Sequence, residues 1–169
     1  MRERPFLEHY TGQSLDELIA LEGKYRIDSL VLAIEEGLQP KTKLTEAEET
    51  VLAVEALERE VGNGGFHQFF FNTPEHAPYV VESLRRIGCP KTATLAEKAI
   101  KALRIDGPLT EKIVRAVAEE DNDLRDELLD KYDDVYYDGA EEPICDKVFA
   151  FAKANRASIT LVGPAGRRR

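Results

Sequence analysis

Runs of apolar residues at three- and four-residue steps, each preceded by a helix-capping pattern, restrict the fold of this 169-residue chain more than any other feature. The clearest run follows Thr45, which stands three residues before Glu48 in the order of a capping box. Its apolar members are Leu44, Ala47, Val51, Val54, Leu57 and Val61. This period is that of a helix with one buried face, whereas only residues 158–162 are β-prone, without an evident partner strand. The sequence therefore predicts an all-α fold.

Helix-start and helix-stop signals divide the chain into about eight short helices. Ser14 and Glu17 form a second capping box. Thr73 followed by Pro74 is a typical first turn, because proline lacks the N–H group that a helix start leaves unbonded. The predicted helices cover residues 14–22, 29–36, 45–61, 73–87, 94–103, 110–117, 123–138 and 143–151. We expect a single compact helical domain over residues 1–169, with a flexible tail at 163–169.

The composition is that of a globular protein, with 43% hydrophobic and 33% charged residues. No apolar run approaches the roughly 20 residues that a membrane-spanning helix needs. Residues 1–10 carry charges and no apolar core, so they do not resemble a signal peptide. The two cysteines, Cys89 and Cys145, are far apart in sequence and are expected to be buried free thiols. These features predict a cytoplasmic protein that does not contact a membrane.

The acidity of the chain is concentrated in residues 119–142. This segment holds twelve acidic residues against Arg125 and Lys131, a net charge of −10, while the whole chain carries −9. At helical spacing, one stripe is predicted to be apolar and buried, namely Leu124, Leu128, Tyr132 and Val135. The other side is predicted to be an exposed, partner-binding acidic face of Asp123, Asp126, Glu127, Asp130, Asp133 and Asp134. Like charges four residues apart repel, so their repetition indicates a binding surface.

The charge density of this segment can be compared with that of DNA. Residues 119–138 have a net charge of −8, and as a helix they would span at most about 30 Å. This is about one charge per 4 Å, against one per roughly 1.7 Å of duplex axis. Two copies side by side in a homodimer would approach the density of DNA.

The residues that metal sites and nucleophilic centres require do not occur in a favourable arrangement. The three histidines, His9, His67 and His76, do not pair with the cysteines at zinc-site spacing. Residues 121–123 begin like a calcium-binding loop, but Asp126 stands where that loop needs glycine. The sequence has no phosphate-binding glycine loop followed by Lys and no Gly-x-Ser-x-Gly pattern. We therefore expect no catalytic residues, no cofactor and no metal.

The glycine-rich residues 62–65 are expected to form a tight turn that ends the preceding helix at Gly62. Such a turn predicts a positive φ at Gly64 or Gly65. The next apolar residues are expected to pack in the core from one face of a short helix, namely Phe66, Phe69 and Phe70. An enzyme is the alternative from another class, with a polar pocket near His67, Gln68 and Asn72.

Residues 62–72, with the sequence GNGGFHQFFFN, resemble the Asn-Gly-Gly-Phe-x-Gln-[Phe/Tyr]-Phe motif of the DNA-mimic protein family. The likeness extends over residues 45–159 and includes the segments 82–88, 93–100 and 128–155. The residues of the motif are interpreted as architecture, a glycine turn followed by a packed aromatic helix. They are Asn63, Gly64, Gly65, Phe66, Gln68, Phe69 and Phe70.

The resemblance implies an all-helical, homodimeric protein without a cofactor. The member that gave the family its name presents carboxylates like DNA phosphates and blocks the DNA-binding surface of a transcription factor. We therefore interpret the chain as a non-enzymatic acidic protein that binds a basic DNA-binding protein and does not itself bind nucleic acid. A second interpretation within the same class is an immunity-type or other regulatory protein whose partner does not bind DNA.

Overall fold

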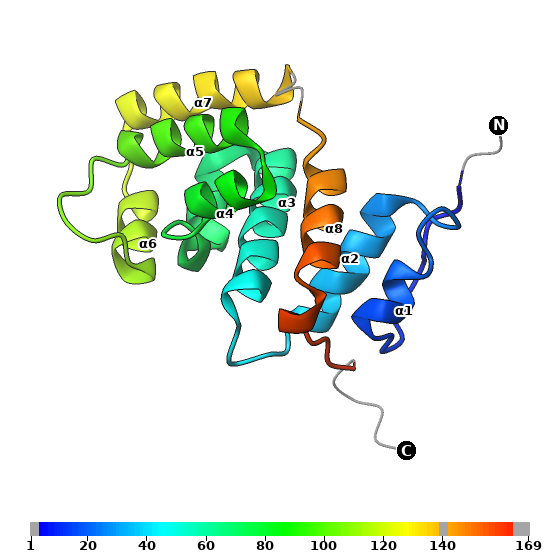
Figure 1. Cartoon of the computed structure of the whole chain (residues 1–169). Coiled ribbons are helices and arrows are strands. Elements are labelled where there is room, and N and C mark those ends of the chain that lie inside the picture. The colour runs from blue at the N-terminus through cyan, green and yellow to red at the C-terminus, as the bar shows by residue number, and fades with distance from the viewer. Residues whose placement is uncertain (1–3, 139–141, 164–169) are drawn as a thin grey trace. The chain divides into compact units, whose positions relative to one another are not determined.

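The computed structural model describes residues 4–138 and 142–163, and their regular structure is helical (Figure 1). The α-helices are α1 (Leu15–Ile19), α2 (Ile27–Leu38), α3 (Glu46–Asn72), α4 (Val80–Ile87), α5 (Pro90–Ala102), α6 (Glu111–Glu119), α7 (Asp123–Tyr137) and α8 (Ile144–Ala154). Two 3₁₀ turns are η1 (Pro74–His76) and η2 (Arg156–Ser158). Within the described ranges no β-strand forms, and Glu22 and Tyr25 make an isolated bridge. The predicted all-α fold is confirmed.

In the described chain, side-chain caps start α1, α3, α6 and α7 where the sequence places these helices. In both capping boxes the hydroxyl of the capping residue accepts a hydrogen bond from the backbone N–H of the glutamate at the third helical position. The carboxylate of that glutamate accepts one from the backbone N–H of the capping residue. At Ser14 these distances are 3.2 and 2.7 Å, and at Thr45 they are 3.2 and 2.9 Å. Thr110 and Asn122 cap α6 and α7 in the same way, through the backbone N–H groups of Ile113 and Arg125.

Three predicted helix starts differ from the structure, and the smallest difference is that α2 begins at Ile27 rather than at Ser29. Residues 73–87 form η1 and α4 instead of one helix, because the Thr73 hydroxyl donates back to the carbonyl of Phe69 rather than capping the next turn. Helix α5 begins at Pro90 instead of Thr94, with proline at its first position. Gly139, the glycine that follows the predicted helix 123–138, and residues 164–169 of the predicted tail lie outside the described residues.

The chain forms two compact units, residues 1–52 with 143–169 and residues 53–142. In the first unit α2 packs against α8 and α1 against α2. The β-prone residues 158–162 form no strand there. Instead, the N–H of Val162 donates to the carbonyl of Gly37 at 2.9 Å, and the N–H of Thr160 donates to the buried carboxylate of Glu48 at 2.8 Å. A single domain over residues 1–169 stays a prediction.

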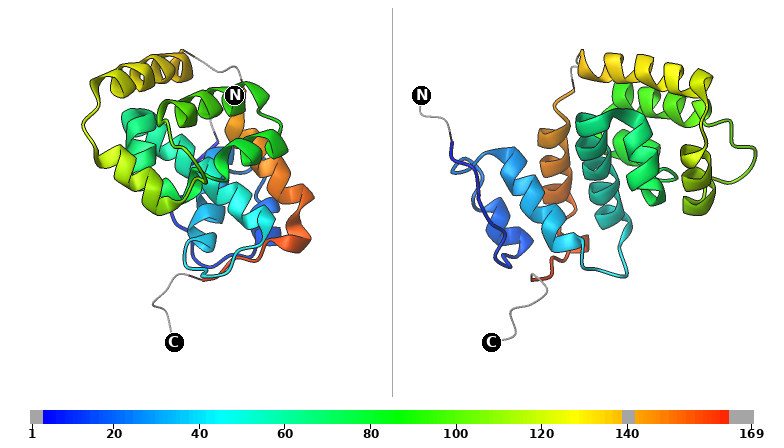
Figure 2. Two further views of the ribbon diagram at one scale, coloured as in Figure 1. Left: turned by 90° about the vertical axis from the view of Figure 1, so that its left-hand side faces the viewer. Right: turned by 180° about the vertical axis from the view of Figure 1, so that it is seen from behind.

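In the second unit, α4 packs on α5, α5 on α7 and α6 on η1 (Figure 2). The core of this unit contains the predicted aromatic residues Phe66, Phe69 and Phe70, each at most 1% exposed. Their rings contact one another, with centroid distances of 6.3 Å for Phe66–Phe70 and 5.4 Å for Phe69–Phe70. The prediction that these three side chains form one buried face is confirmed. Phe71, outside that face, is 44% exposed.

Candidate functional site

The glycine-rich segment produces a sharp break inside α3. Gly65 has φ 78° and ψ −178°, while Gly64 is extended at φ −163°. The predicted positive φ is therefore confirmed at Gly65. The predicted helix end at Gly62 is wrong, because the helical hydrogen bonding continues up to the break at Gly64 and resumes after it.

The carboxylate of Asp133 on α7 occupies the inside of this break. Its Oδ1 accepts a hydrogen bond of 2.8 Å from the backbone N–H of Phe66, which begins the helical segment after the break. A Cβ atom at Gly65 would lie 2.0 Å from the other carboxylate oxygen. Glycine is thus required here both for its backbone conformation and for the space that Asp133 fills.

Burial raises the pKa of Asp133 above its usual range. The hydrogen bond from Phe66 acts in the opposite direction, while the neighbouring carboxylates of Asp130 and Asp134 raise the pKa further. Asp133 is half-buried. Its placement in the predicted exposed face is therefore wrong, because this carboxylate caps a helix start instead of facing solvent.

Two tyrosines on α7 fix the same end of the helix to α3. The ring of Tyr136 meets that of Phe66 edge-on, with centroids 6.0 Å apart. The Tyr136 hydroxyl donates to the carboxylate of Glu58, and the Tyr137 hydroxyl donates to the carbonyl of Val61. Burial raises the pKa of Glu58 to about 7. Asp133, Tyr136 and Tyr137, at helical spacing, thus anchor the acidic helix to the break in α3.

A second polar network joins the two halves of α3. The Glu60 carboxylate accepts hydrogen bonds from the amides of Gln68 at 2.9 Å and Asn72 at 2.8 Å. Burial alone would raise the pKa of Glu60, but these amides and Arg59 outweigh it and hold the pKa below its usual range. Gln68 and Asn72, which the enzyme alternative places in a pocket, therefore bind the carboxylate that holds the two halves together.

His67, the third residue of that alternative, is exposed. Its Nε2 lies 3.2 Å from the carbonyl oxygen of Ala118, and its ring stacks on Phe71 at 6.4 Å between centroids. No carboxylate is hydrogen-bonded to this ring in the part of the chain that the structure describes. The contacts of His67 are those of a side chain that ties α3 to α6.

Helix α7 buries a different face from the one predicted. Its buried side chains are Arg125 and Leu129, while Leu124 is 66% exposed and Val135 is 55% exposed. Leu128 and Tyr132 are half-buried. The prediction that Leu124 and Val135 face the core is wrong.

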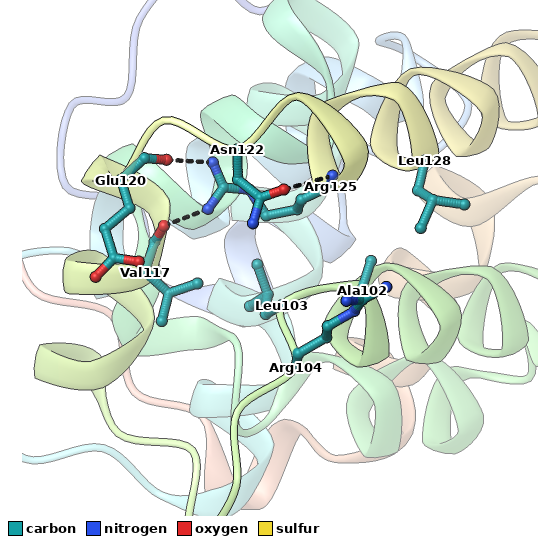
Figure 3. Close-up of a pocket in the computed structure, with 8 residues that line it drawn as sticks. All are labelled: Ala102, Leu103, Arg104, Val117, Glu120, Asn122, Arg125 and Leu128. Atoms are coloured by element: carbon teal, nitrogen blue, oxygen red, sulfur yellow. Dashed lines mark hydrogen bonds between the residues drawn. The ribbon is translucent and has the colours of Figure 1, made fainter.

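The physical reason is the guanidinium of Arg125, which donates to the backbone carbonyls of Val117 and Glu120 at the end of α6 (Figure 3). Carbonyls in the last turn of a helix lack the usual donor four residues on. That of Val117 accepts only a 3.3 Å hydrogen bond from the Glu120 N–H, and the buried arginine gives both carbonyls a further donor. This side chain lines a cavity of about 170 Å³. The other residues that line it are Ala102, Leu103, Arg104, Val117, Glu120, Asn122 and Leu128.

Four of the six predicted acidic-face residues, Asp123, Glu127, Asp130 and Asp134, are exposed. Among the residues that the structure describes, none of these four forms a salt bridge. Asp126 is half-buried and pairs with Arg125 at 3.0 Å, so its charge is partly compensated. We define the acidic stripe as Asp123, Glu127, Asp130 and Asp134. Further exposed carboxylates in the segment belong to Glu119, Glu120, Asp121 and Asp138.

Glu142, which the sequence counts within the acidic segment, has a structural role that no local pattern indicates. Its carboxylate accepts from the backbone N–H groups of Lys91 and Thr92, both at 2.9 Å, and from the Thr92 hydroxyl at 2.7 Å. It therefore caps the start of α5. Burial would raise its pKa, but these hydrogen bonds outweigh burial and lower it.

Over residues 4–138 and 142–163, no three metal-ligating side chains converge. In the same ranges, no helix has the length and the apolar character to cross a bilayer. Cys89 is buried as predicted, whereas Cys145 is half-buried.

The fold and these contacts define an all-helical protein that holds a strongly acidic helix against a glycine break in a neighbouring helix. Residues 42–155 match the model of the DMP19-like protein family, and since this is more than half of the chain, the chain belongs to that family. It is a family of DNA-mimic proteins, so the resemblance carried by residues 62–72 is confirmed. No curated protein and no solved structure matches the chain.

Proposed function

We propose that this chain is a non-enzymatic DNA mimic, in which the acidic stripe of α7 occupies the nucleic-acid-binding surface of a basic protein. The observation that carries the proposal is the stripe itself. Asp123, Glu127, Asp130 and Asp134 follow one another at four- and three-residue steps on one exposed side of α7, and within the described chain no base neutralises them by a salt bridge.

The density of these charges supports the proposal quantitatively. Helix α7 has 15 residues, a length of about 22 Å. The stripe and the exposed Asp138 place about one carboxylate per 5 Å along it, against about 3.4 Å per phosphate along one DNA strand. The density is lower than the sequence suggests, because Asp126 and Asp133 are engaged within the fold. A homodimer would double the number of carboxylates and is part of the proposal.

The partner in this proposal is a DNA-binding protein with a basic surface, encountered in the cytoplasm. Opposite charges on the two surfaces would speed their association, and the complex would weaken as salt rises, since exposed charges are screened within about 8 Å at physiological ionic strength. Nucleic acid itself would be repelled by the acidic stripe, so the proposal includes no direct binding of DNA or RNA.

A charge-reversal experiment tests this function. The test variant carries Asp123→Lys, Asp130→Lys and Asp134→Lys. A control variant of equal net charge carries Glu36→Lys, Glu75→Lys and Asp106→Lys, at exposed positions on other elements. The probe is a basic DNA-binding protein that the chain captures from lysate and that duplex DNA releases. The proposal predicts that the test variant loses binding of this probe while the control keeps most of it, and equal affinity in the two folded variants would refute it.

A further inference from the structure

Helix α7 carries a second exposed feature beside the acidic stripe. Leu124 and Val135 are 66% and 55% exposed, and Leu128, between them in sequence, is half-buried. The three side chains follow one another at steps of four and seven residues, which places them along one line on a helix. We call Leu124, Leu128 and Val135 the apolar strip.

The packing of α7 within its unit leaves this strip open. The helix turns Arg125 and Leu129 inward and fixes its C-terminal half through Asp133 and Tyr136. On a helix with about 100° per residue, the apolar strip lies between this buried side and the acidic stripe. It extends about 16 Å from Leu124 to Val135. Of the two bases in residues 119–138, Arg125 is buried, while Lys131 is exposed and its helical position lies between the strip and the stripe.

We propose that the apolar strip and the acidic stripe form one composite surface, which docks a basic amphipathic helix of the partner protein. This inference rests on the proposed function and adds the chemistry of the partner's contact region. The apolar side of the docked helix would cover Leu124, Leu128 and Val135. Its lysines and arginines would lie along Asp123, Glu127, Asp130 and Asp134.

Charge complementarity selects this occupant. An uncharged apolar segment would leave four carboxylates desolvated without partners, which costs free energy. A purely basic segment would leave Leu124 and Val135 facing charge. A helix with apolar and basic sides satisfies both, and its straight contact line suits a strip of about 16 Å. Such interfaces draw affinity from an apolar centre and association rate from the surrounding charges.

The test uses two synthetic helical peptides of equal length and equal positive charge. One has leucines along the side opposite its lysines, and the other has serines there. Each peptide is titrated against the full chain and against the variant Leu124→Gln, Val135→Gln. A control variant carries Tyr79→Gln, which removes a 45% exposed side chain between η1 and α4. Circular dichroism of the double variant separates a loss of binding from a loss of fold, and the single variant Leu124→Gln is titrated in its place if the double variant does not fold.

We expect the leucine peptide to bind the wild-type chain at least about tenfold more tightly than the serine peptide, as burial of one or two apolar side chains would give. This preference should vanish in the double variant and persist in the Tyr79→Gln control. It should also survive at 0.5 M salt, where the contribution of the carboxylates is strongly reduced. Equal binding of both peptides, or an unchanged preference in the double variant, would overturn the inference.

Two results separate this inference from the proposed function. If reversal of the acidic stripe abolishes binding of the DNA-binding protein while the double variant binds it normally, the mimic function stands and the composite surface falls. If light scattering shows a dimer that becomes a monomer in the double variant, the strip is an interface between copies of this chain. That result also overturns the inference.

Discussion

The carboxylate of Asp133 accepts a 2.8 Å hydrogen bond from the backbone N–H of Phe66, and this contact joins the acidic helix to the motif that marks the family. Gly65, immediately before Phe66, has no side chain, which leaves the space that the carboxylate fills. The motif residues therefore form the site on α3 to which α7 is fixed. The glycines of the motif and Phe66 form the surface on which Asp133 and Tyr136 are held.

Removal of the Asp133 side chain should destabilise the protein by more than removal of an exposed carboxylate of the same charge. Asp133→Ala leaves the N–H of Phe66 without its acceptor and should destabilise the protein by about 1–3 kcal/mol. Asp134→Ala removes the same charge from an exposed position and should change stability by less than about 0.5 kcal/mol. Urea denaturation of both variants measures the difference, and hydrogen exchange should show faster opening of α7 in Asp133→Ala alone. Equal stabilities would show that Asp133 does not anchor the helix.

Substitution by alanine should affect stability differently at Gly65 and at Gly62. Gly65→Ala should cost more than about 1 kcal/mol, since the residue has φ 78° and its new Cβ would meet Asp133. Gly62→Ala should be neutral or stabilise by up to about 1 kcal/mol, because Gly62 has no positive φ and its Cβ would meet open space. Thermal unfolding of both variants gives the comparison.

A double-mutant cycle refines the Gly65 prediction. In an Asp133→Ala background the clash at Gly65 is gone, and only the backbone strain is left. Gly65→Ala should therefore cost less there than in the wild-type chain. Strictly additive costs would show that Gly65 and Asp133 are energetically independent.

Glu58 predicts a dependence of stability on pH. Its pKa is raised from 4.5 to about 7, so the folded state binds a proton more tightly than the unfolded state. The contribution of protonated Glu58 to the free energy of unfolding is fully present below pH 4.5 and is lost as the pH rises through about 7. Glu58→Gln keeps an acceptor for Tyr136 without a charge, so it should stabilise the protein at pH 8 by about 1–3 kcal/mol and have little effect at pH 4. A gain of equal size at both pH values would contradict this assignment.

The oligomeric state is a separate prediction. The charge density of one helix, which is lower than that of DNA, favours the homodimer that the proposed function includes. Light scattering at tens of micromolar protein should give a mass twice the 19.0 kDa of one chain. A monomer at this concentration would leave the mimic with only the charge of one α7.

Local signals made much of this fold predictable. Capping residues such as Ser14 and Thr45 act through hydrogen bonds within four residues, so their sequence pattern is sufficient to place a helix start. The positive φ at Gly65 was predictable for the same reason, because a tight break between helical segments demands it. The buried face of Phe66, Phe69 and Phe70 follows from helical spacing.

The orientation of α7 depends on partners distant in sequence and could not be predicted in this way. Hydrophobic spacing favours Leu124 and Val135 as buried residues, but Arg125 takes the inward position because the carbonyls at the end of α6 need donors. Asp133 reaches Phe66, 67 residues away in sequence. Sequence spacing cannot distinguish a carboxylate that binds within the fold, such as Asp133, from an exposed one, since both kinds recur at the same helical steps.

Competition with duplex DNA tests whether the acidic stripe occupies the nucleic-acid-binding surface of the partner. The measurement uses the basic DNA-binding protein that the chain captures, bound to its fluorescent duplex, with the chain added in increasing amounts. If the acidic stripe occupies the nucleic-acid-binding surface, the duplex must be released completely, and the inhibition constant must equal the affinity of the chain for the free protein. The Asp123→Lys, Asp130→Lys, Asp134→Lys variant must release none. A ternary complex of chain, partner and duplex would contradict DNA mimicry by the acidic stripe.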